Sequence, residues 1–245
     1  MVMPSAKYYS VVDNMLKKIY QTQAIKINEA AKIIADKIAN GGMIYIFGCG
    51  HSHLVSLDCF YRAGGLACVS PILDSGLMLH EGAVKSSVYE KLEGLAQPIF
   101  ERYDITSADI MVIVSTSGIN SVPVQMAEIA SERGITTIGI TSSAYFTQKP
   151  RYREGKMLYQ AVDICIDNCV PLGDAAVDIG DGNIKAGPVS TIASSFIMQS
   201  ILLNSIYFLS EQGIDPPIYC SSNLMGGAEH NRSMISSYKS KIKHL

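Results

Sequence analysis

Charged residues are scarce in this sequence, and their signs almost cancel. Lys, Arg, Asp and Glu make up 17% of the 245 residues and leave a net charge of −2, whereas 48% of the residues are hydrophobic. This composition argues against disorder, because so apolar a chain can bury a sizeable core. The missing basic excess argues against broad nucleic-acid binding, which needs a positive face to neutralise phosphates. A small anionic ligand needs no such excess.

The sequence also lacks any C-x-x-C pair among its six cysteines. Cys165 and Cys169 are four residues apart, but no histidine or second cysteine pair accompanies them, so their spacing does not indicate a zinc site. Buried free thiols are the expected state of these residues in a cytoplasmic protein. We therefore expect neither a metal nor another cofactor.

No uninterrupted apolar segment reaches the length of a membrane span. The N-terminus lacks the apolar stretch of a secretory signal. Six polar residues interrupt the longest apolar run, at about 192–209, which suits a buried helix better than a membrane span. These interruptions are Ser194, Ser195, Gln199, Ser200, Asn204 and Ser205. The sequence therefore predicts a cytoplasmic protein that does not enter a membrane.

Short apolar runs alternate along the chain with longer segments of helical periodicity. Strands are expected at 43–47, 66–72, 110–114, 136–140 and 162–166. Helices are expected at 52–63, 86–103, 121–133, 152–160 and about 188–212. A short run that is apolar throughout is typical of a strand buried on both faces, and hence of a parallel sheet. The alternation predicts an α/β domain with a five-stranded parallel sheet.

Two further segments flank the expected α/β domain, which spans residues 41–212. Residues 1–40 are expected to form an N-terminal helical extension, because apolar residues recur there at helical spacing and Asn40-Gly41-Gly42 follows. Whether this extension is one helix or a pair broken near 21–24 stays open. Residues 213–245 form a polar tail that we expect to fold over the surface, near the ligand site.

Two polar loops follow the first and third expected strands. The first is Gly48-Cys49-Gly50-His51-Ser52, whose glycines let the backbone approach a ligand closely. The second is Ser115-Thr116-Ser117-Gly118-Ile119-Asn120, which is rich in hydroxyl and amide groups. Ligands of open α/β sheets bind at the carboxyl ends of the strands, where helix N-termini favour anions. The pair of loops therefore predicts a phosphate-binding site.

Other interpretations of these loops are weaker. A glycine-x-glycine sequence can be a simple tight turn, and His53 stands where a dinucleotide site would have its third glycine. Asp74 lies at a suitable distance in sequence for a ribose contact, so a nucleotide remains an alternative. The second loop has no Gly-Lys-Ser/Thr and is not a P-loop. Helix capping needs only one Ser or Asn, whereas this loop supplies several such residues.

The run Ile113-Val114-Ser115-Thr116-Ser117-Gly118, followed by Asn120, Pro123 and Ala127, resembles the phosphate loop of the SIS (sugar isomerase) domain. The resemblance covers about residues 30–210 and is closest to an uncharacterised bacterial family similar to phosphoheptose isomerase. It implies a Rossmann-like, flavodoxin-type three-layer α/β/α sandwich, assembled as a homodimer or homotetramer. The residues expected to bind phosphate are Gly50, His51, Ser52, Ser115, Thr116, Ser117, Gly118 and Asn120.

The resemblance does not extend to the catalytic residues. Phosphoheptose isomerases have a glutamate on the helix after the first loop and a histidine on the last long helix. The matching positions here are Arg62 and approximately Ser200, and neither can serve as the base or the acid. Aldose–ketose isomerisation needs such groups beside the sugar. The candidates for catalysis are His80, Glu81 and His230.

Each of these candidates also has a purely structural interpretation. Glu81 can begin the helix that follows it, because acidic residues favour the first turn. His230 can be a solvated residue of the tail. Ser190-Thr191, at the start of the last helix, resembles a pair that related proteins place near the sugar, but it also suits an N-cap.

Two functions from different classes are consistent with this sequence. The first is a metal-free sugar-phosphate isomerase, or a related lyase, acting on a phosphorylated hexosamine or heptose. The second is a sensor that binds a sugar phosphate without turnover. Sensors of this kind usually carry a helix-turn-helix DNA-binding domain. Residues 1–40 are too short and not basic enough for one, which favours the enzyme and the absence of a nucleic-acid partner.

Overall fold

The computed structural model describes residues 3–180 and 184–245 of the chain. Its main sheet has five parallel strands in the order β2-β1-β3-β4-β5. The strands are β1 (Ile44–Gly48), β2 (Val69–Ile72), β3 (Ile110–Val114), β4 (Thr136–Thr141) and β5 (Ile164–Asp167). The predicted five-stranded parallel sheet is thereby confirmed, and its order is that of the flavodoxin-type fold.

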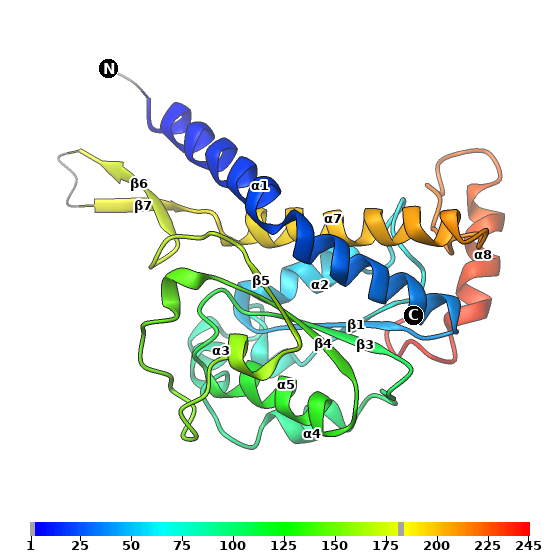
Figure 1. The fold of residues 1–245 in the computed structure, drawn as a ribbon, viewed down its shortest axis with the longest axis horizontal. Helices are drawn as coiled ribbons and strands as arrows, with labels where there is room; N and C mark the ends of the chain where they lie inside the picture. Colours follow the sequence, from blue (N-terminus) through cyan, green and yellow to red (C-terminus); the bar gives the residue numbers. More distant parts are fainter. Residues whose placement is uncertain (1–2, 181–183) are drawn as a thin grey trace.

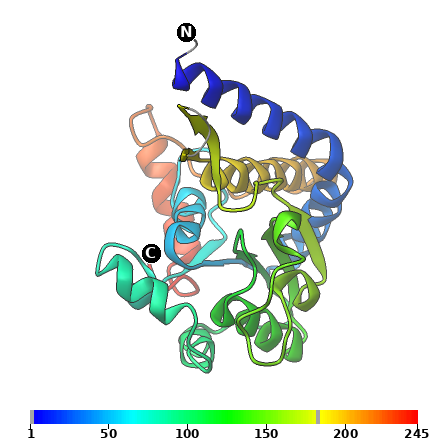
Figure 2. The same cartoon turned by 90° about the vertical axis from the view of Figure 1, so that its left-hand side faces the viewer.

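Helices cover both faces of this sheet and make three layers (Figures 1 and 2). One face carries the first and last long helices together with the helix after β1: α1 (Pro4–Ala39), α7 (Ser190–Glu211) and α2 (His53–Cys59). The other carries the helices that follow β2, β3 and β4: α3 (Ala83–Tyr89), α4 (Ala96–Phe100), α5 (Ser121–Glu132) and α6 (Leu158–Ala161). This arrangement explains why the central strands are apolar throughout, since every residue of β1 and β3 is buried.

The N-terminal extension is one unbroken helix of 36 residues, not a broken pair. Its apolar residues pack along α7, and the two helices lie side by side over the sheet (Figure 2). Ile27 and Ile34 of α1 are buried, as are Ile197 and Ile201 of α7. The extension therefore belongs to the core of the α/β domain and is not an appendage to it.

Two other predictions need correction. The helix expected at 86–103 is split into α3 and α4, because Gly94 has a positive φ of 84° that breaks the helical path between them. An antiparallel hairpin, β6 (Ala175–Ile179) and β7 (Ile184–Pro188), precedes α7 and was not predicted. The residues of β7 are largely exposed, so they lack the apolar run that reveals the buried strands.

Most of the C-terminal tail packs at the amino-terminal ends of the strands, whereas the prediction placed it near the ligand site; its end approaches the carboxyl end of β2, where His244 contacts the Tyr103 hydroxyl that bonds to Leu73. It contains α8 (Gly227–Tyr238), which Figure 1 shows beside the C-terminal end of α7. The backbone of Pro217 and Tyr219 bonds to the segment that leads into β2, and Lys241 Nζ donates to Gly41 O just before β1. These contacts hold the tail at the amino-terminal ends of β1 and β2.

Length and apolar composition alone would allow α7 to cross a membrane. Its packing is that of a core helix, because Ile197, Met198 and Ile201 are fully buried against the rest of the chain. Hydroxyl groups along it, such as those of Ser200 and Ser205, donate to the helix's own carbonyls four residues earlier.

The packing of α1 can be tested with two isoleucines of the same helix. Ile34 is completely buried and Ile25 is 83% exposed. We expect Ile34→Ala to lower the free energy of unfolding by about 2–5 kcal/mol, because a buried cavity remains. Ile25→Ala, the matched control, should change it by less than about 0.5 kcal/mol. Urea unfolding curves measure both, and equal losses would contradict the packing described here.

Candidate functional site

The candidate site lies where the strand order reverses direction. The chain passes from β1 outward to β2 and then returns to place β3 on the other side of β1. The helices after β1 and β3 therefore cover opposite faces, and the loops that lead into them part at the carboxyl edge. A crevice forms at such a reversal, and it is the usual ligand site of open α/β sheets. Both loops singled out from the sequence lie there.

The first loop is a tight turn that only glycines permit. Gly50 has a φ of 56°, and a β-carbon on Gly48 would lie 2.6 Å from the backbone of Ser52. The imidazole of the buried His53 bonds through Nδ1 to Gly50 O, which fixes the turn from below. His51 is exposed and Ser52 half-buried, so these two side chains are the ones available to a ligand.

In the second loop several carbonyls are hydrogen-bonded to neighbouring segments, whereas most N–H groups are left unpaired within the described part of the chain. Gly118 O and Ile119 O accept from Leu158 N and Arg151 N, whereas Gly118 N donates to Ser115 Oγ. Within the described part of the chain, no acceptor is present for the N–H groups of the four remaining loop residues. These residues are Thr116, Ser117, Ile119 and Asn120.

Such unpaired donors, followed at once by the N-terminus of the twelve-residue α5, form a site suited to an anion. The side chain of Ser117 is half-buried and likewise has no partner among the described residues, so it adds a hydroxyl donor to these N–H groups.

A small polar cleft joins the two loops to α7. Ser52, Thr116, Ser190, Thr191 and Ser194 line it, together with the apolar Val55 and Val114. The fully buried Asn168, just after β5, donates to both Thr116 Oγ1 at 3.2 Å and Ser194 Oγ at 3.3 Å. Asn168 therefore ties the second loop to the last helix, a role that sequence reasoning missed because the residue stands alone after its strand.

The start of α7 is capped by an acidic side chain from outside the helix. Asp174 Oδ1 accepts from the N–H groups of Val189 and Ser190, and its Oδ2 accepts from Ser190 Oγ at 2.7 Å. The Asp174 carboxylate thus takes the place that an anionic ligand would otherwise have at the N-terminus of α7. Ser190 is thereby held by a cap partner and Ser194 Oγ accepts from Asn168, which leaves Thr191 as the α7 residue of the cleft whose hydroxyl has no partner among the described residues.

The side-chain oxygen of Asn120 is already engaged, so its backbone N–H is the group that has no partner among the described residues. Asn120 is buried, and its Oδ1 accepts from Arg151 Nη1 at 2.9 Å, while Arg151 N donates to Ile119 O. Asn120 thus anchors an exposed arginine against the second loop. Sequence reasoning missed Arg151 because it lies in the long segment between β4 and α6.

The predicted catalytic residues His80 and Glu81 lie in the connection between β2 and α3. The His80 ring stands edge-on to His53, with 6.2 Å between ring centroids, so His80 reaches the first loop. Glu81 is exposed and pairs with Lys85 at 3.4 Å. A hydrogen bond from Ser75, assisted by Lys85, lowers the pKa of Glu81 from its ordinary value, which weakens it as a base.

The third predicted catalytic residue, His230, is not brought to this site. It lies on α8, and its Nε2 contacts Ile218 O within the tail. The tail is held at the amino-terminal ends of the strands, so within one chain His230 and the two loops lie at opposite edges of the sheet. The sequence could not place it, because nothing in a polar tail indicates which edge it will cover.

Glu90, directly after α3, is a half-buried acidic residue whose backbone bonds to the start of α5. Its backbone carbonyl accepts from Val122 N at the start of α5. Burial raises the pKa of its side chain from 4.5, an effect that Lys91 and Arg151 partly oppose. Its charge also adds to burial in raising the pKa of the Cys49 thiol in the first loop. A half-buried carboxylate with a raised pKa beside a ligand loop is a candidate base or acid.

The thiols are free and show no sign of activation. Burial raises the pKa of Cys49 well above its ordinary value and that of Cys59 and Cys68 to about 12, so these groups are protonated at neutral pH. Across residues 3–180 and 184–245, no group of three His, Cys, Asp or Glu side chains is placed to hold a metal ion.

A protein-family comparison matches residues 7–142 to the SIS domain. Relatives of similar length align over almost the whole chain. A UPF0309 protein of Geobacillus thermodenitrificans is 40% identical over 98% of this chain and 96% of its own. A UPF0309 protein of Thermoanaerobacter pseudethanolicus is 42% identical over 98% of this chain and 99% of its own. One of Listeria innocua is 41% identical over 97% of both chains.

Solved structures share the fold at much lower identity. The phosphoheptose isomerase of Neisseria gonorrhoeae matches 84% of this chain and 97% of its own, with a TM-score of 0.55 and 15% identity. A proposed phosphosugar isomerase involved in capsule formation from Bacteroides fragilis matches 82% and 88%, with a TM-score of 0.52 and 14% identity. These similarities establish the α/β architecture with its N-terminal helix.

The geometry of the second loop can be tested at its glycine. Gly118 has a φ of 61°, and a β-carbon there would lie 2.7 Å from Thr141 Oγ1, which itself donates to Thr116 O. Gly118→Ala should therefore lower the free energy of unfolding by about 2 kcal/mol or more, since strain and a steric clash combine. Gly50→Ala, with a φ of 56° but nothing within 4 Å, should cost only about 1–2 kcal/mol. Chemical denaturation compares them, and equal costs would contradict the close contact at Gly118.

Proposed function

This chain belongs to the SIS domain family, and we propose that it binds a phosphorylated sugar at the carboxyl edge of its sheet. The observation that carries this proposal is the group of N–H donors at Thr116, Ser117, Ile119 and Asn120. A phosphate placed there accepts several charge-assisted hydrogen bonds and faces the positive end of α5. Family membership supports sugar phosphates as the class of ligand.

The phosphate is held by the second loop and the sugar extends toward the first. Ser117 Oγ supplies a free hydroxyl beside the N–H groups, and Arg151, fixed by Asn120, adds a positive charge at the rim. Ser115 Oγ is occupied with Gly118 N and serves mainly to shape the loop. The hydroxyls of Ser52 and Thr191 line the cleft next to it, where they can pair with sugar hydroxyls.

For the reaction we propose aldose–ketose isomerisation without a metal. The base must remove a proton beside the carbonyl, and its pKa should approach the working pH. Glu90 meets this requirement better than Glu81, because burial raises the pKa of Glu90 whereas hydrogen bonding lowers that of Glu81. His80, which reaches His53 in the first loop, is the proposed partner that moves protons between the sugar oxygens.

A sensor that binds a sugar phosphate without turnover is the alternative function. It is favoured by the positions that correspond to the catalytic pair of the heptose isomerases. Arg62, just after α2, forms an ion pair with Asp58 of that helix, and Ser200 Oγ donates to Phe196 O. Neither position carries a free acid or base. A lyase would use the same ligand site and would be recognised by its products.

We further propose a cytoplasmic homodimer or homotetramer with no nucleic-acid partner. Large apolar side chains stay exposed on the outer surfaces of α1 and α7, among them Ile25, Leu203 and Tyr207. Such side chains support the association of helices between copies of the chain. The net charge of −2 supports the absence of a nucleic-acid partner.

The proposed phosphate contact of Ser117 is tested by measuring how Ser117→Ala binds a panel of hexose, hexosamine and heptose phosphates. A hydrogen bond to a charged group is worth about 1.5–3 kcal/mol, so the dissociation constant should rise about 10- to 100-fold. Ser131→Ala, at the other end of α5 and exposed, should leave binding unchanged. Isothermal titration calorimetry measures both. If no phosphosugar binds the unaltered protein, the proposed function is wrong.

The choice of base is tested by Glu90→Gln, with Glu81→Gln as the control of equal charge. We expect Glu90→Gln to lower kcat about 100-fold or more and Glu81→Gln to change it less than about threefold. In addition, kcat/KM should fall on the acid side of its pH profile with a midpoint above pH 4.5. The base must be ionised to act, and the pKa of Glu90 is raised above 4.5. An acid limb below 4.5 that disappears in Glu81→Gln would instead identify Glu81. Binding without turnover would favour the sensor.

The same raised pKa has a consequence for stability. The folded state holds the Glu90 proton more tightly than the unfolded chain, so the contribution of this group is full below pH 4.5 and is lost as pH rises through the raised pKa. Glu90→Gln should therefore gain stability relative to the unaltered protein between pH 4 and 8, as measured by chemical denaturation. A gain that grows as pH falls would contradict the raised pKa.

A further inference from the structure

A second cleft, of about 360 Å³, opens beside the C-terminal tail. Residues 239–245 form one wall, and Arg102, Tyr103 and Asp104, which lie between α4 and β3, form the other with Tyr45 of β1. The cleft lies along the β2 edge of the sheet, and none of the residues that line it also lines the polar cleft at the two loops after β1 and β3. The size suits a small ligand, since ligand pockets measure about 300–1,000 Å³.

The lining of this cleft is strongly basic in a chain of nearly neutral composition. Lys239, Lys241 and Lys243 alternate along the tail, and Arg102 faces them across the cleft, whereas Asp104 is the acidic side chain in the lining. The three lysines are exposed, and none forms an ion pair with another residue of the described chain. Lys241 and Lys243 make long hydrogen bonds of 3.3 Å to the backbone carbonyls of Gly41 and Arg102, and Lys243 Nζ also lies 5.7 Å from the centroid of the Tyr103 ring.

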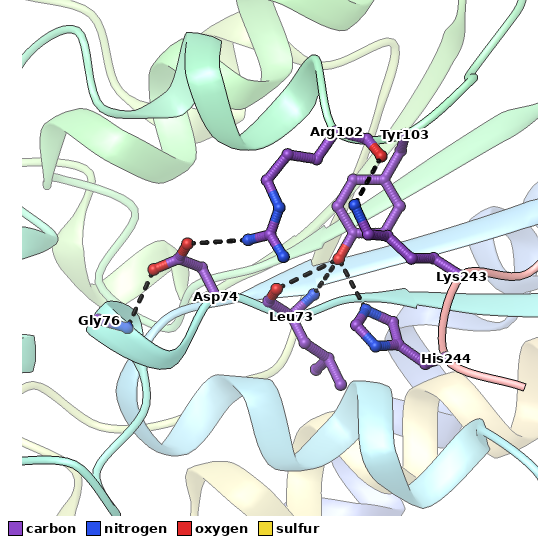
Figure 3. A network of polar contacts seen from close by, with 7 residues as sticks. All are labelled: Leu73, Asp74, Gly76, Arg102, Tyr103, Lys243 and His244. Atoms are coloured by element: carbon purple, nitrogen blue, oxygen red, sulfur yellow. Dashed lines mark hydrogen bonds and ion pairs between the residues drawn. The ribbon is translucent and has the colours of Figure 1, made fainter.

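The backbone that carries these basic side chains is held in place by hydrogen bonds and by a buried side chain. Tyr103 Oη accepts from Leu73 N at 2.8 Å, approaches Leu73 O at 3.2 Å and contacts His244 Nε2 at 2.9 Å, which fastens the tail to the end of β2 (Figure 3). The Ile242 side chain, between two of the lysines, is buried. The lysines therefore project from a segment whose backbone is already ordered, which lowers the entropic cost of binding a ligand.

We propose that this cleft binds a small ligand with two or more phosphate groups. Four cations, one of them the Asp74-paired Arg102, line the cleft against the carboxylates of Asp104 and of the last residue, Leu245, and lysine ammonium groups bind phosphate oxygens as point charges. Tyr45 and Tyr103 are buried, so the site offers no exposed aromatic face for a base or a sugar ring. Recognition therefore rests on the phosphate groups.

The ion pair that Arg102 forms with Asp74 leads to a specific prediction. Its Nη1 pairs with Asp74 Oδ2 at 3.2 Å, while Asp74 Oδ1 accepts from Gly76 N (Figure 3). A polyphosphate in the cleft competes with Asp74 for this guanidinium. Asp74→Asn keeps an oxygen for Gly76 N but removes the competing charge, so it should tighten binding several-fold.

Pyrophosphate is the probe, and the five histidines are the local reporters. His244 lies beside the cleft, and His51 is in the first loop of the sugar site. In the full chain labelled with ¹³C-histidine, pyrophosphate at low ionic strength should shift the ring resonances of His244 and leave those of His51 in place. Calorimetry should show tighter binding of pyrophosphate than of inorganic phosphate, weakened by salt.

Two triple variants complete the test. Lys239→Gln, Lys241→Gln and Lys243→Gln together should weaken pyrophosphate binding at least tenfold and leave the melting temperature unchanged, because the three lysines are exposed. Lys7→Gln, Lys18→Gln and Lys185→Gln remove the same charge elsewhere and should leave it unaffected. Equal weakening by both sets, a shift of His51 in place of His244, equal binding of inorganic phosphate, or no binding would overturn the proposal. None of these outcomes depends on whether the loops after β1 and β3 bind a sugar phosphate.

Discussion

The structure depends on one constraint, which is the order of the strands in the sheet. The chain runs from β1 to β2 in one direction and then from β3 to β5 in the other, so the order reverses between β1 and β3. The reversal sends the helices after β1 and β3 to opposite faces, so their loops separate at the carboxyl edge. No side chain is needed to make the resulting crevice. The glycines at 48, 50 and 118 let the two loops turn within it, and the N–H groups of the second loop are left to face a ligand.

Binding and chemistry are consequently supplied by different parts of the chain. The anion site consists of backbone N–H groups and small hydroxyls, which the fold itself positions. The acid and base that we propose, His80 and Glu90, lie in the connection from β2 to α3 and directly after α3. In this chain the position that corresponds to the glutamate of the heptose isomerases carries the ion-paired Arg62, and the half-buried Glu90 lies on a different segment.

The sequence predicted the structure well where consecutive residues of one short segment are all buried. The apolar runs of β1, β3 and β4 predicted the sheet, and the two polar loops were found because glycine and hydroxyl residues follow those strands directly. Features that depend on distant contacts were missed. His230 was assigned to the wrong edge, since only tertiary contacts such as Lys241 to Gly41 fix the tail. Glu90 was overlooked because it lay inside a helix expected to continue to residue 103.

The central claim is that the phosphate of a sugar is held by the loop after β3. A crystal structure with whichever phosphosugar most raises the melting temperature tests this claim most directly. The account predicts phosphate oxygens within hydrogen-bonding distance of the N–H groups of Ser117 and Ile119 and of Ser117 Oγ, with the sugar directed toward Ser52 and Glu90. A phosphate bound at any other edge of the sheet, with the loop after β3 empty, would contradict it.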